Sequence, residues 1–453
     1  MDHTLRPPGR QAGGIWIWHP ENLDVDGLLK SYGHRVGEGV LWLGHCVYNG
    51  LADDARCRDT GRVPLMAKYL HKVLGRHYVD AVRQAAFEAG YVDRDGSYRA
   101  GVHSQNYRIL APYNRARLVQ RDINNPGLCH NVRQWREARR REMWKQIERQ
   151  ETPVAAAVCR HLWRNLQKIR IDAKIDFGET FHPSYQIVVV HIREREFRFT
   201  VDDYGRVHTN VTNLPKALRH FLAVDGKRLV DVDVSESQPL FLGVAIARFN
   251  SRRTETVQRG ARGTDGGQEG RQQQAEGRRG TPSLMFDNTM FDKNPQLAGE
   301  LDRRRLPADV RRYLELCEAR GLYQAVADRL GKTREEAKRS VMVAFYDRPS
   351  HCNAVSVVLT ELFPSVMQAM RRIKRGDYRR LAHIAQRIES AFMFGRVVPR
   401  IMELRPDLFI TTIHDSILTP VGEADFVRQV MLDEFARLGL SPQVKVELCS
   451  KTC

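Results

Sequence analysis

Residues Arg228-Leu-Val-Asp-Val-Asp-Val-Ser-Glu-Ser-Gln-Pro239 carry the pattern from which the rest of this sequence can be interpreted. Leucine and valine recur among the acids, which predicts a β-strand with Asp231 and Asp233 on one face. Two carboxylates on one strand face are costly unless a cation or solvent compensates their charge. The segment therefore predicts either a cation-binding site or an exposed edge strand that is guarded by charges.

A second segment, from Leu408 to Val421, predicts a β-hairpin. Two apolar strands flank His414-Asp415-Ser416, which places a carboxylate at the tip of the hairpin. Asp415 is then either a second cation ligand or an ordinary turn aspartate, since aspartate is common in turns.

A third segment, Thr333-Arg-Glu-Glu-Ala-Lys-Arg-Ser-Val-Met-Val-Ala-Phe-Tyr346, predicts a helix that starts with a capping box between Thr333 and Glu336. Arg334, Lys338, Met342 and Tyr346 recur every four residues along one slowly turning face. The two cations and the helix N-terminus would hold a triphosphate, with the methionine and tyrosine against a base and sugar. The alternative is an amphipathic surface helix.

Together the three segments point to one chemistry. Carboxylates from two separate strands can hold two divalent ions about 3.5–4 Å apart, the arrangement that supports in-line phosphoryl displacement. The composition agrees, because 72 Lys and Arg against 54 Asp and Glu leave a charge of +18, which indicates a polyanionic partner. Ribosomal proteins and nucleases share such an excess, so charge alone names no function.

Taken in chain order, the segments resemble motifs A, B and C of the family A DNA polymerases and the related single-subunit phage RNA polymerases. Asp233-Val-Ser235 resembles motif A, Arg334-x3-Lys338-x7-Tyr346 has the spacing of motif B, and His414-Asp415 resembles motif C. Upstream, Gly205-Arg206 is similar to the segment that precedes motif A and touches nucleic acid. Gln386 matches a glutamine that contacts the primer–template. The resemblance covers roughly residues 200–447.

The resemblance implies an α+β fold, a right-hand palm built on an antiparallel sheet with helical fingers. It implies that Asp233 and Asp415, with the main-chain carbonyl of Val234, hold two Mg²⁺ ions, the metal that hard oxygen ligands and phosphates favour. It also implies which side chains meet the substrates. Arg334, Lys338, Met342, Tyr346 and Gln238 contact the nucleotide, Lys338 also protonates the leaving pyrophosphate, and Arg206, Gln386 and His414 contact nucleic acid.

The sequence departs from the family at several positions. Ser416 follows motif C, as in the RNA enzymes, and Asp347 replaces a glycine that is usual in both groups. Gln238 stands where the DNA enzymes carry a bulky glutamate that excludes a 2′-hydroxyl. Glutamine is nearly as large as glutamate, so we expect a DNA polymerase, although the side chain would also suit a hydrogen bond to the hydroxyl. We expect no proofreading, because no acidic cluster in the first 200 residues resembles an exonuclease. The alternatives are a single-subunit RNA polymerase or primase-like enzyme, a catalytically degenerate nucleic-acid-binding protein, and a metal-dependent nuclease.

The predicted domains start with an N-terminal region, 1–111, in which residues 60–111 suit a winged-helix-like module that binds nucleic acid or protein. Helical patterns at 63–70 and 78–87 and a hairpin ending near residue 110 support it. A helical thumb-like region, 112–200, contains a charged helix at 131–150, either solvated or lying along a duplex, and a β-rich stretch at 185–193.

The predicted palm covers 201–250 and 376–453, and the fingers cover 282–375. Between them, residues 251–281 are rich in Arg, Gly, Gln and Glu, which predicts a mobile basic insertion. Eight scattered cysteines, no secretory signal and no long apolar run predict a cytoplasmic protein with free thiols and no membrane partner. Cys449 and Cys453 are at most a weak metal candidate. The oligomeric state is not predicted.

Overall fold

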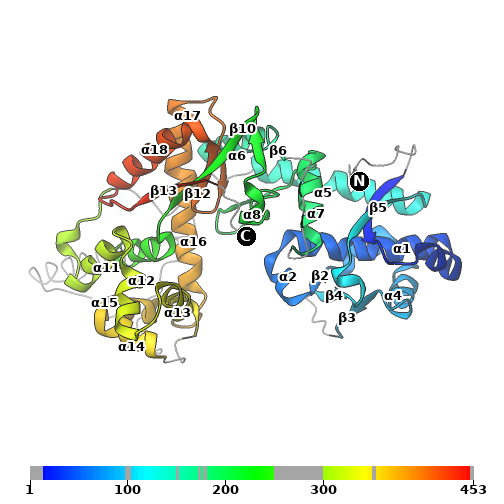
Figure 1. Ribbon diagram of the computed structural model, residues 1–453, viewed down its shortest axis with the longest axis horizontal. Coiled ribbons are helices and arrows are strands. Elements are labelled where there is room, and N and C mark those ends of the chain that lie inside the picture. The colour runs from blue at the N-terminus through cyan, green and yellow to red at the C-terminus, as the bar shows by residue number, and fades with distance from the viewer. Residues whose placement is uncertain are drawn as a thin grey trace, which may run out of the picture. The chain divides into compact units, whose positions relative to one another are not determined.

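A computed structural model of the chain describes residues 14–96, 104–148, 153–171, 181–248, 299–348 and 353–448, together with residues 175 and 177. The predicted insertion at 251–281 and the Cys449/Cys453 pair lie outside these residues. The chain divides into two units (Figure 1). Unit one comprises the described residues up to Thr200 and His208–Leu229, and unit two comprises Val201–Val207 and Val230–Leu448.

Unit one is mainly helical, with short antiparallel strand pairs. Its elements are β1 (Ile15–Pro20), α1 (Val25–Asp53), α2 (Ala55–Thr60), β2 (Val63–Leu65), α3 (Ala67–Leu74), α4 (Val79–Glu88), β3 (Val92–Arg94), β4 (Gln105–Ile109), β5 (Leu118–Ile123), α5 (Pro126–Glu148), α6 (Pro153–Leu166), β6 (Arg170–Ile171), α7 (Ser184–Arg193), α8 (Lys216–Arg219) and β9 (Leu222–Val224). β1 pairs with β5, and a second sheet has the order β2-β4-β3.

The long helix α1 organises the core of unit one. It packs against α4, α7 and β1, and its second half buries Val40, Leu41, Leu43 and Val47. α7 overturns the prediction of a β-rich stretch at 185–193, because those residues are helical. Burial on most sides explains the difference, since a helix enclosed by apolar neighbours needs no amphipathic pattern and tolerates β-branched residues.

The prediction of a helix at 63–70 is also wrong for the first three residues. Val63–Leu65 form strand β2, which pairs with β4, and α3 starts only at Ala67. Pro64 explains this, because the residue before a proline is pushed away from the helical region and towards extended backbone. The helices predicted at 78–87 and 131–150 and the predicted hairpin correspond to α4, α5 and the pair β3–β4.

Unit two combines an antiparallel sheet with a helical cluster. Strand β10 (Lys227–Val234) enters it from unit one, and residues 237–248 are helical. The later helices are α11 (Ala308–Glu318), α12 (Leu322–Leu330), α13 (Arg334–Tyr346), α14 (Ala354–Leu362), α15 (Pro364–Ile373), α16 (Arg380–Phe392), α17 (Val398–Leu404) and α18 (Ala424–Ala436), and the later strands are β11 (Thr411–Ile413), β12 (Ser416–Pro420) and β13 (Val444–Leu448).

The sheet of unit two has β10 in an interior position. β10 neighbours β12, which forms a hairpin with β11, and it also pairs antiparallel with β13. Figure 1 shows α11–α15 gathered away from this sheet and α16 running between the two parts. α16 passes through a π-helical turn, Met393–Val397, into α17. The fold is therefore a mixed helix and sheet fold with antiparallel strands.

A hairpin of β7 (Phe199–Val201) and β8 (Val207–Thr209) leads into and out of the short stretch Val201–Val207 of unit two. Asp202 shapes the turn of this hairpin by accepting hydrogen bonds from the amides of Tyr204 and Arg206, each at 2.9 Å. Gly205 has φ = +80° there, a conformation that side chains disfavour.

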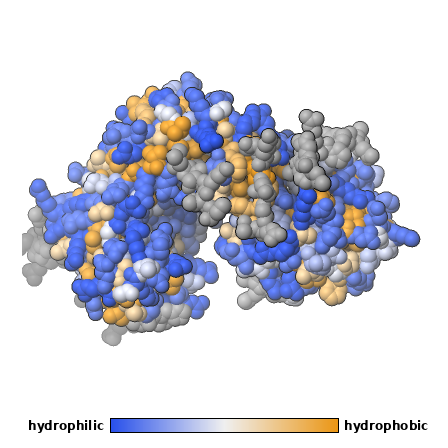
Figure 2. All heavy atoms as spheres, in the orientation of Figure 1, coloured by the Kyte–Doolittle hydropathy of each residue, from blue (hydrophilic) through white to orange (hydrophobic). Residues whose placement is uncertain are grey.

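Hydrophilic residues predominate on the face of the molecule that Figure 2 shows, with smaller hydrophobic areas between them. No described helix combines the length and the apolar composition that a membrane span requires.

Candidate active site

The candidate site is built around the end of β10 in unit two. Asp231 and Asp233 face Glu447 and Lys445 on β13, in the register of the antiparallel pair. Asp231 is buried, whereas Asp233 is half-buried. Because β10 pairs with strands on both of its edges, the alternative of an exposed, charge-guarded edge strand is wrong.

Asp415 lies at the tip of the β11–β12 hairpin, as the sequence predicts. His414 precedes it with φ = +56°, which turns the chain sharply between the strands. The hydroxyl of Ser237 donates a hydrogen bond to Oδ2 of Asp415, although 178 residues separate them in the chain. This contact joins the hairpin tip to the first residue of the helix that follows β10, so the segments that contain Asp233 and Asp415 meet.

Helix α13 begins with the predicted capping box. The amide of Glu336 donates to the hydroxyl of Thr333, and the carboxylate of Glu336 accepts from the amide of Thr333. This prediction is confirmed. The box sets the first residue of the helix, Arg334, against the turn that follows β10.

Arg334 is held there by Glu236, 98 residues away, through an ion pair of 2.7 Å. The Glu236 side chain is only 2% exposed, and its backbone has φ = +51°. Burial raises the pKa of Glu236, and the charge of Arg334 opposes that rise. The guanidinium of Arg334 also lies 5.5 Å from the ring centre of Tyr323.

The rest of the α13 face lies as follows. Lys338, one turn after Arg334, is exposed. The sulfur of Met342 accepts a hydrogen bond of 3.7 Å from the Tyr323 hydroxyl. Tyr346 is half-buried, and burial raises its pKa to about 12, with Glu389 acting in the same direction and Arg206 against it.

Arg206 has a partner that sequence reasoning missed. Its Nη2 atom lies 2.8 and 3.0 Å from the two carboxylate oxygens of Glu389 on α16. The Glu389 side chain is buried, with 3% of its surface exposed, and the Arg206 side chain is largely buried, with 13% exposed. Burial raises the pKa of Glu389 to about 8, helped by the nearby charge of Asp415 and opposed by Arg206.

A signal for Glu389 exists in the sequence. The apolar face of α16 includes Ala385 and Phe392, and Glu389 falls between them at helical spacing. An acid on a buried apolar face requires a partner, so this position marks an internal ion pair. Gln386, the residue singled out from sequence, lies one turn earlier and is half-buried, as are Gln238 and His414.

The donors available for a metal are few. Within the described ranges, no group of three or more His, Cys, Asp or Glu side chains is placed to hold a metal ion. The chain therefore offers Asp233 and Asp415 as separate carboxylates at the ends of neighbouring strands. This donor set fits Mg²⁺, which is usually bound by one or two carboxylates plus substrate phosphates and water.

Comparisons with known proteins find distant similarity to solved structures alone. No protein-family model matches the chain, and no curated protein matches it. Among solved structures, the POL domain of Pol1 from M. smegmatis, in complex with DNA primer-template and dNTP, is similar at a TM-score of 0.27 and 15% sequence identity. The match covers 60% of this chain and 53% of that one, so the chain spans about half of that structure. A similarity this weak does not establish a shared fold.

Proposed function

We propose that this chain is a template-directed nucleotidyltransferase, a DNA polymerase of the family A type without proofreading. One observation carries the proposal. The segment Asp233–Gln238, which runs from the end of β10 into the helix at 237–248, contacts Asp415 through Ser237 and Arg334 through Glu236. Acids and a cation from three distant segments therefore converge on six residues. Transfer of a nucleotide needs such a combination, because negative charge must be neutralised on both the attacking and the leaving side.

Asp233 and Asp415, with the carbonyl of Val234, are the residues that would hold two Mg²⁺ ions. When bound, these ions would lower the pKa of the primer hydroxyl and neutralise the phosphates. The chain's own contribution is orientation. Ser237 donates a hydrogen bond to Asp415 and so fixes the orientation of this carboxylate.

Arg334 and Lys338 are the proposed triphosphate contacts. Glu236 binds Nη2 of Arg334 at 2.7 Å, and the exposed Glu335 lies 3.8 Å from Nη1. The pair with Glu236 orients a side chain that is still 31% exposed, so phosphate oxygens can reach its guanidinium. Lys338 is exposed and presents an ammonium group, the proposed proton donor to pyrophosphate. Met342 and Tyr346 would contact the base and sugar of the incoming nucleotide.

Nucleic acid is the second proposed partner of this site. Arg206, Gln386 and His414 are the proposed contacts, and all three belong to unit two. The buried Glu389 positions Arg206, because it binds one nitrogen of the guanidinium with both carboxylate oxygens.

The test is primer extension by the purified chain with dNTPs and Mg²⁺ on a primed DNA template. Asp415→Asn should abolish extension while the fold is retained, because the amide loses the charge that a metal requires. Asp407→Asn is the matched control, since Asp407 is exposed and lies in the segment just before β11. Extension by Asp415→Asn at the rate of the control would refute the metal assignment.

Sugar choice is tested in the same assay with dNTPs and NTPs in parallel. Gln238 is the second residue of the helix at 237–248 and is half-buried, and its side chain is nearly as large as that of glutamate. If it excludes a 2′-hydroxyl, Gln238→Gly should increase the use of NTPs. Unchanged discrimination, together with better use of NTPs by the natural chain, would favour an RNA polymerase.

A further inference from the structure

Unit one contains a helix–turn–helix followed by a β-hairpin. Strand β2 is followed by α3, α4, β3 and β4, and the strands form a sheet in the order β2-β4-β3. Gly75, with φ = +91°, ends α3 and starts the turn into α4. In such modules the second helix commonly enters a groove of DNA, so the charge of α4 indicates how this one is used.

The exposed face of α4 does not suit a polyanion. Asp80, Gln84, Phe87 and Glu88 are exposed. The one cation of the helix, Arg83, is turned inwards, with its side chain 13% exposed, Nε donating to the Tyr107 hydroxyl at 2.9 Å and Nη1 bound to Asp80. A helix that presents two acids and a phenylalanine would repel phosphates.

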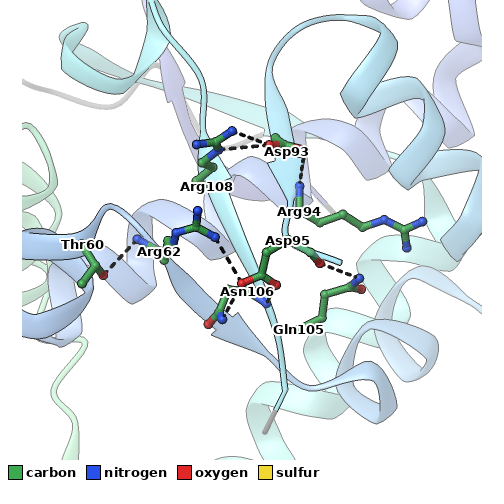
Figure 3. Close-up of polar contacts among 8 residues, drawn as sticks. All are labelled: Thr60, Arg62, Asp93, Arg94, Asp95, Gln105, Asn106 and Arg108. Atoms are coloured by element: carbon green, nitrogen blue, oxygen red, sulfur yellow. Dashed lines mark hydrogen bonds and ion pairs between the residues drawn. The ribbon is translucent and has the colours of Figure 1, made fainter. Parts of the chain in front are cut away.

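The arginines of the hairpin are largely neutralised as well (Figure 3). Arg108 binds Asp93 at 2.8 Å, and Arg62 binds Asp95 at 3.2 Å. Of the cations in Figure 3, Arg94 is the one whose guanidinium is drawn away from the acids. The described part of the hairpin therefore has little net positive charge to offer.

Positive charge is concentrated instead on α3 and α5, which pack against each other. Lys68 and Lys72 are exposed on α3, which contains no acid. α5 carries six Lys or Arg residues against three Glu residues, and Arg139 and Arg140 are exposed one turn beyond Trp135. We call Lys68, Lys72, Arg139 and Arg140 the α3–α5 basic surface.

Trp135 joins the two helices of this surface. Its ring lies 4.9 Å from the ring of Tyr69 on α3, and the Lys72 ammonium lies 5.5 Å from the Trp135 ring centre. The side-chain amide of Asn131 also donates to the carbonyl of Val73 at 3.1 Å. These contacts hold α3 against α5 and place Lys72 beside Trp135, one turn before Arg139 and Arg140, so the exposed cations lie on two helices that form a rigid pair.

We propose that the α3–α5 basic surface binds the phosphate backbone of a DNA duplex, and that α4 and the hairpin do not. Four exposed cations on two packed helices can each displace a counterion from a phosphate, which makes binding strong at low salt and independent of sequence. The choice of DNA as the polyanion rests on the proposed function. The surface itself uses none of the residues of the candidate active site.

The experiment compares two double variants of the full chain with the same change in charge. Lys72→Glu with Arg139→Glu alters the basic surface. Lys30→Glu with Arg94→Glu alters two exposed cations elsewhere in unit one, one of them on the hairpin. Binding to a short blunt duplex of arbitrary sequence is measured by fluorescence anisotropy over a KCl series, in EDTA and without nucleotides, so that catalysis plays no part.

We expect the first variant to bind at least about tenfold more weakly at low salt and to lower the salt slope by about 0.9 for each phosphate that the protein no longer neutralises. The second variant should bind nearly as the unaltered chain does. Equal weakening in both variants, no weakening in either, or weakening confined to the second would each overturn the proposal. Asp415→Asn should bind this duplex normally, so failure of the proposed catalytic role would be seen separately, in primer extension.

Discussion

Replacing Glu389 with alanine should destabilise unit two substantially. Glu389 is 3% exposed and holds the 13% exposed Arg206 through two contacts of 2.8 and 3.0 Å. Burial raises the pKa of Glu389 to about 8, so glutamine would imitate the protonated carboxyl, whereas alanine removes both acceptor oxygens in either protonation state. Removing one partner of a buried ion pair costs about 3–5 kcal/mol, because the remaining charge stays out of water without compensation. Arg206 keeps some contact with water, so the expected loss lies near the lower end, about 3 kcal/mol.

The matched control is Glu403→Ala in the same unit. Glu403 also forms an ion pair with an arginine, Arg400, at 2.6 Å, but its side chain is 69% exposed. An exposed pair three residues apart on a helix contributes at most about 0.5 kcal/mol. The two variants share one chemical change and differ in burial, so the difference between them isolates the cost of leaving a buried charge unpaired.

Urea unfolding provides the measurement, because urea does not screen charges. With a slope of about 2 kcal/mol per molar urea, a loss of about 3 kcal/mol lowers the midpoint by about 1.5 M. The chain contains six tryptophans, and all of them precede residue 200. Far-UV circular dichroism reports the helices of both units, whereas tryptophan fluorescence follows unit one. A shift in the dichroism transition without a shift in the fluorescence transition therefore belongs to unit two. A shift no larger than that of Glu403→Ala would refute a buried pair between Arg206 and Glu389.

Three further outcomes are expected. Lys338→Ala should raise KM for the nucleotide and slow its incorporation. The urea midpoint should stay the same, because Lys338 is exposed. Unchanged kinetics of single-nucleotide incorporation would show that Lys338 is not part of the site. Thr333→Ala should cost about 1 kcal/mol in circular-dichroism melts, because the capping box is removed, and no change would contradict the cap. Burial lowers the pKa of His182 to about 4, and the charges of Arg115 and Arg58 act in the same direction. As the pH drops from 6.5 towards 4, this histidine is protonated in the unfolded chain before it is protonated in the folded chain, so the free energy of unfolding should fall. In urea unfolding followed by tryptophan fluorescence, His182→Gln should show a weaker dependence of stability on pH. A stability of the natural chain that does not change between pH 6.5 and 4 would contradict this role of His182.

The proposed catalytic residues and the elements that carry them were accessible from sequence, because local rules govern them. Alternation of valine with aspartate is enough to predict β10, and Thr333 with Glu336 is enough to start α13. His414 and Asp415 stand at the hairpin tip for the same reason, since two short apolar runs flank them. In each case the residues that determine the structure lie within a few positions of one another.

Local rules failed where burial decides the conformation. Val188, Val189 and Val190 favour a strand by propensity, yet they lie in α7, which is enclosed by neighbours that include α1. Whether β10 is an edge or an interior strand was equally open, because it depends on β12 and β13, which lie far along the chain.

By itself, the sequence determined which side chains carry charge and which short segments present them. Only the tertiary structure decided their partners, since Glu236 meets Arg334 and Glu389 meets Arg206 across 98 and 183 residues. The physical reason is that a buried charge must be neutralised by whatever the fold brings within about 3 Å, and sequence distance does not limit that choice.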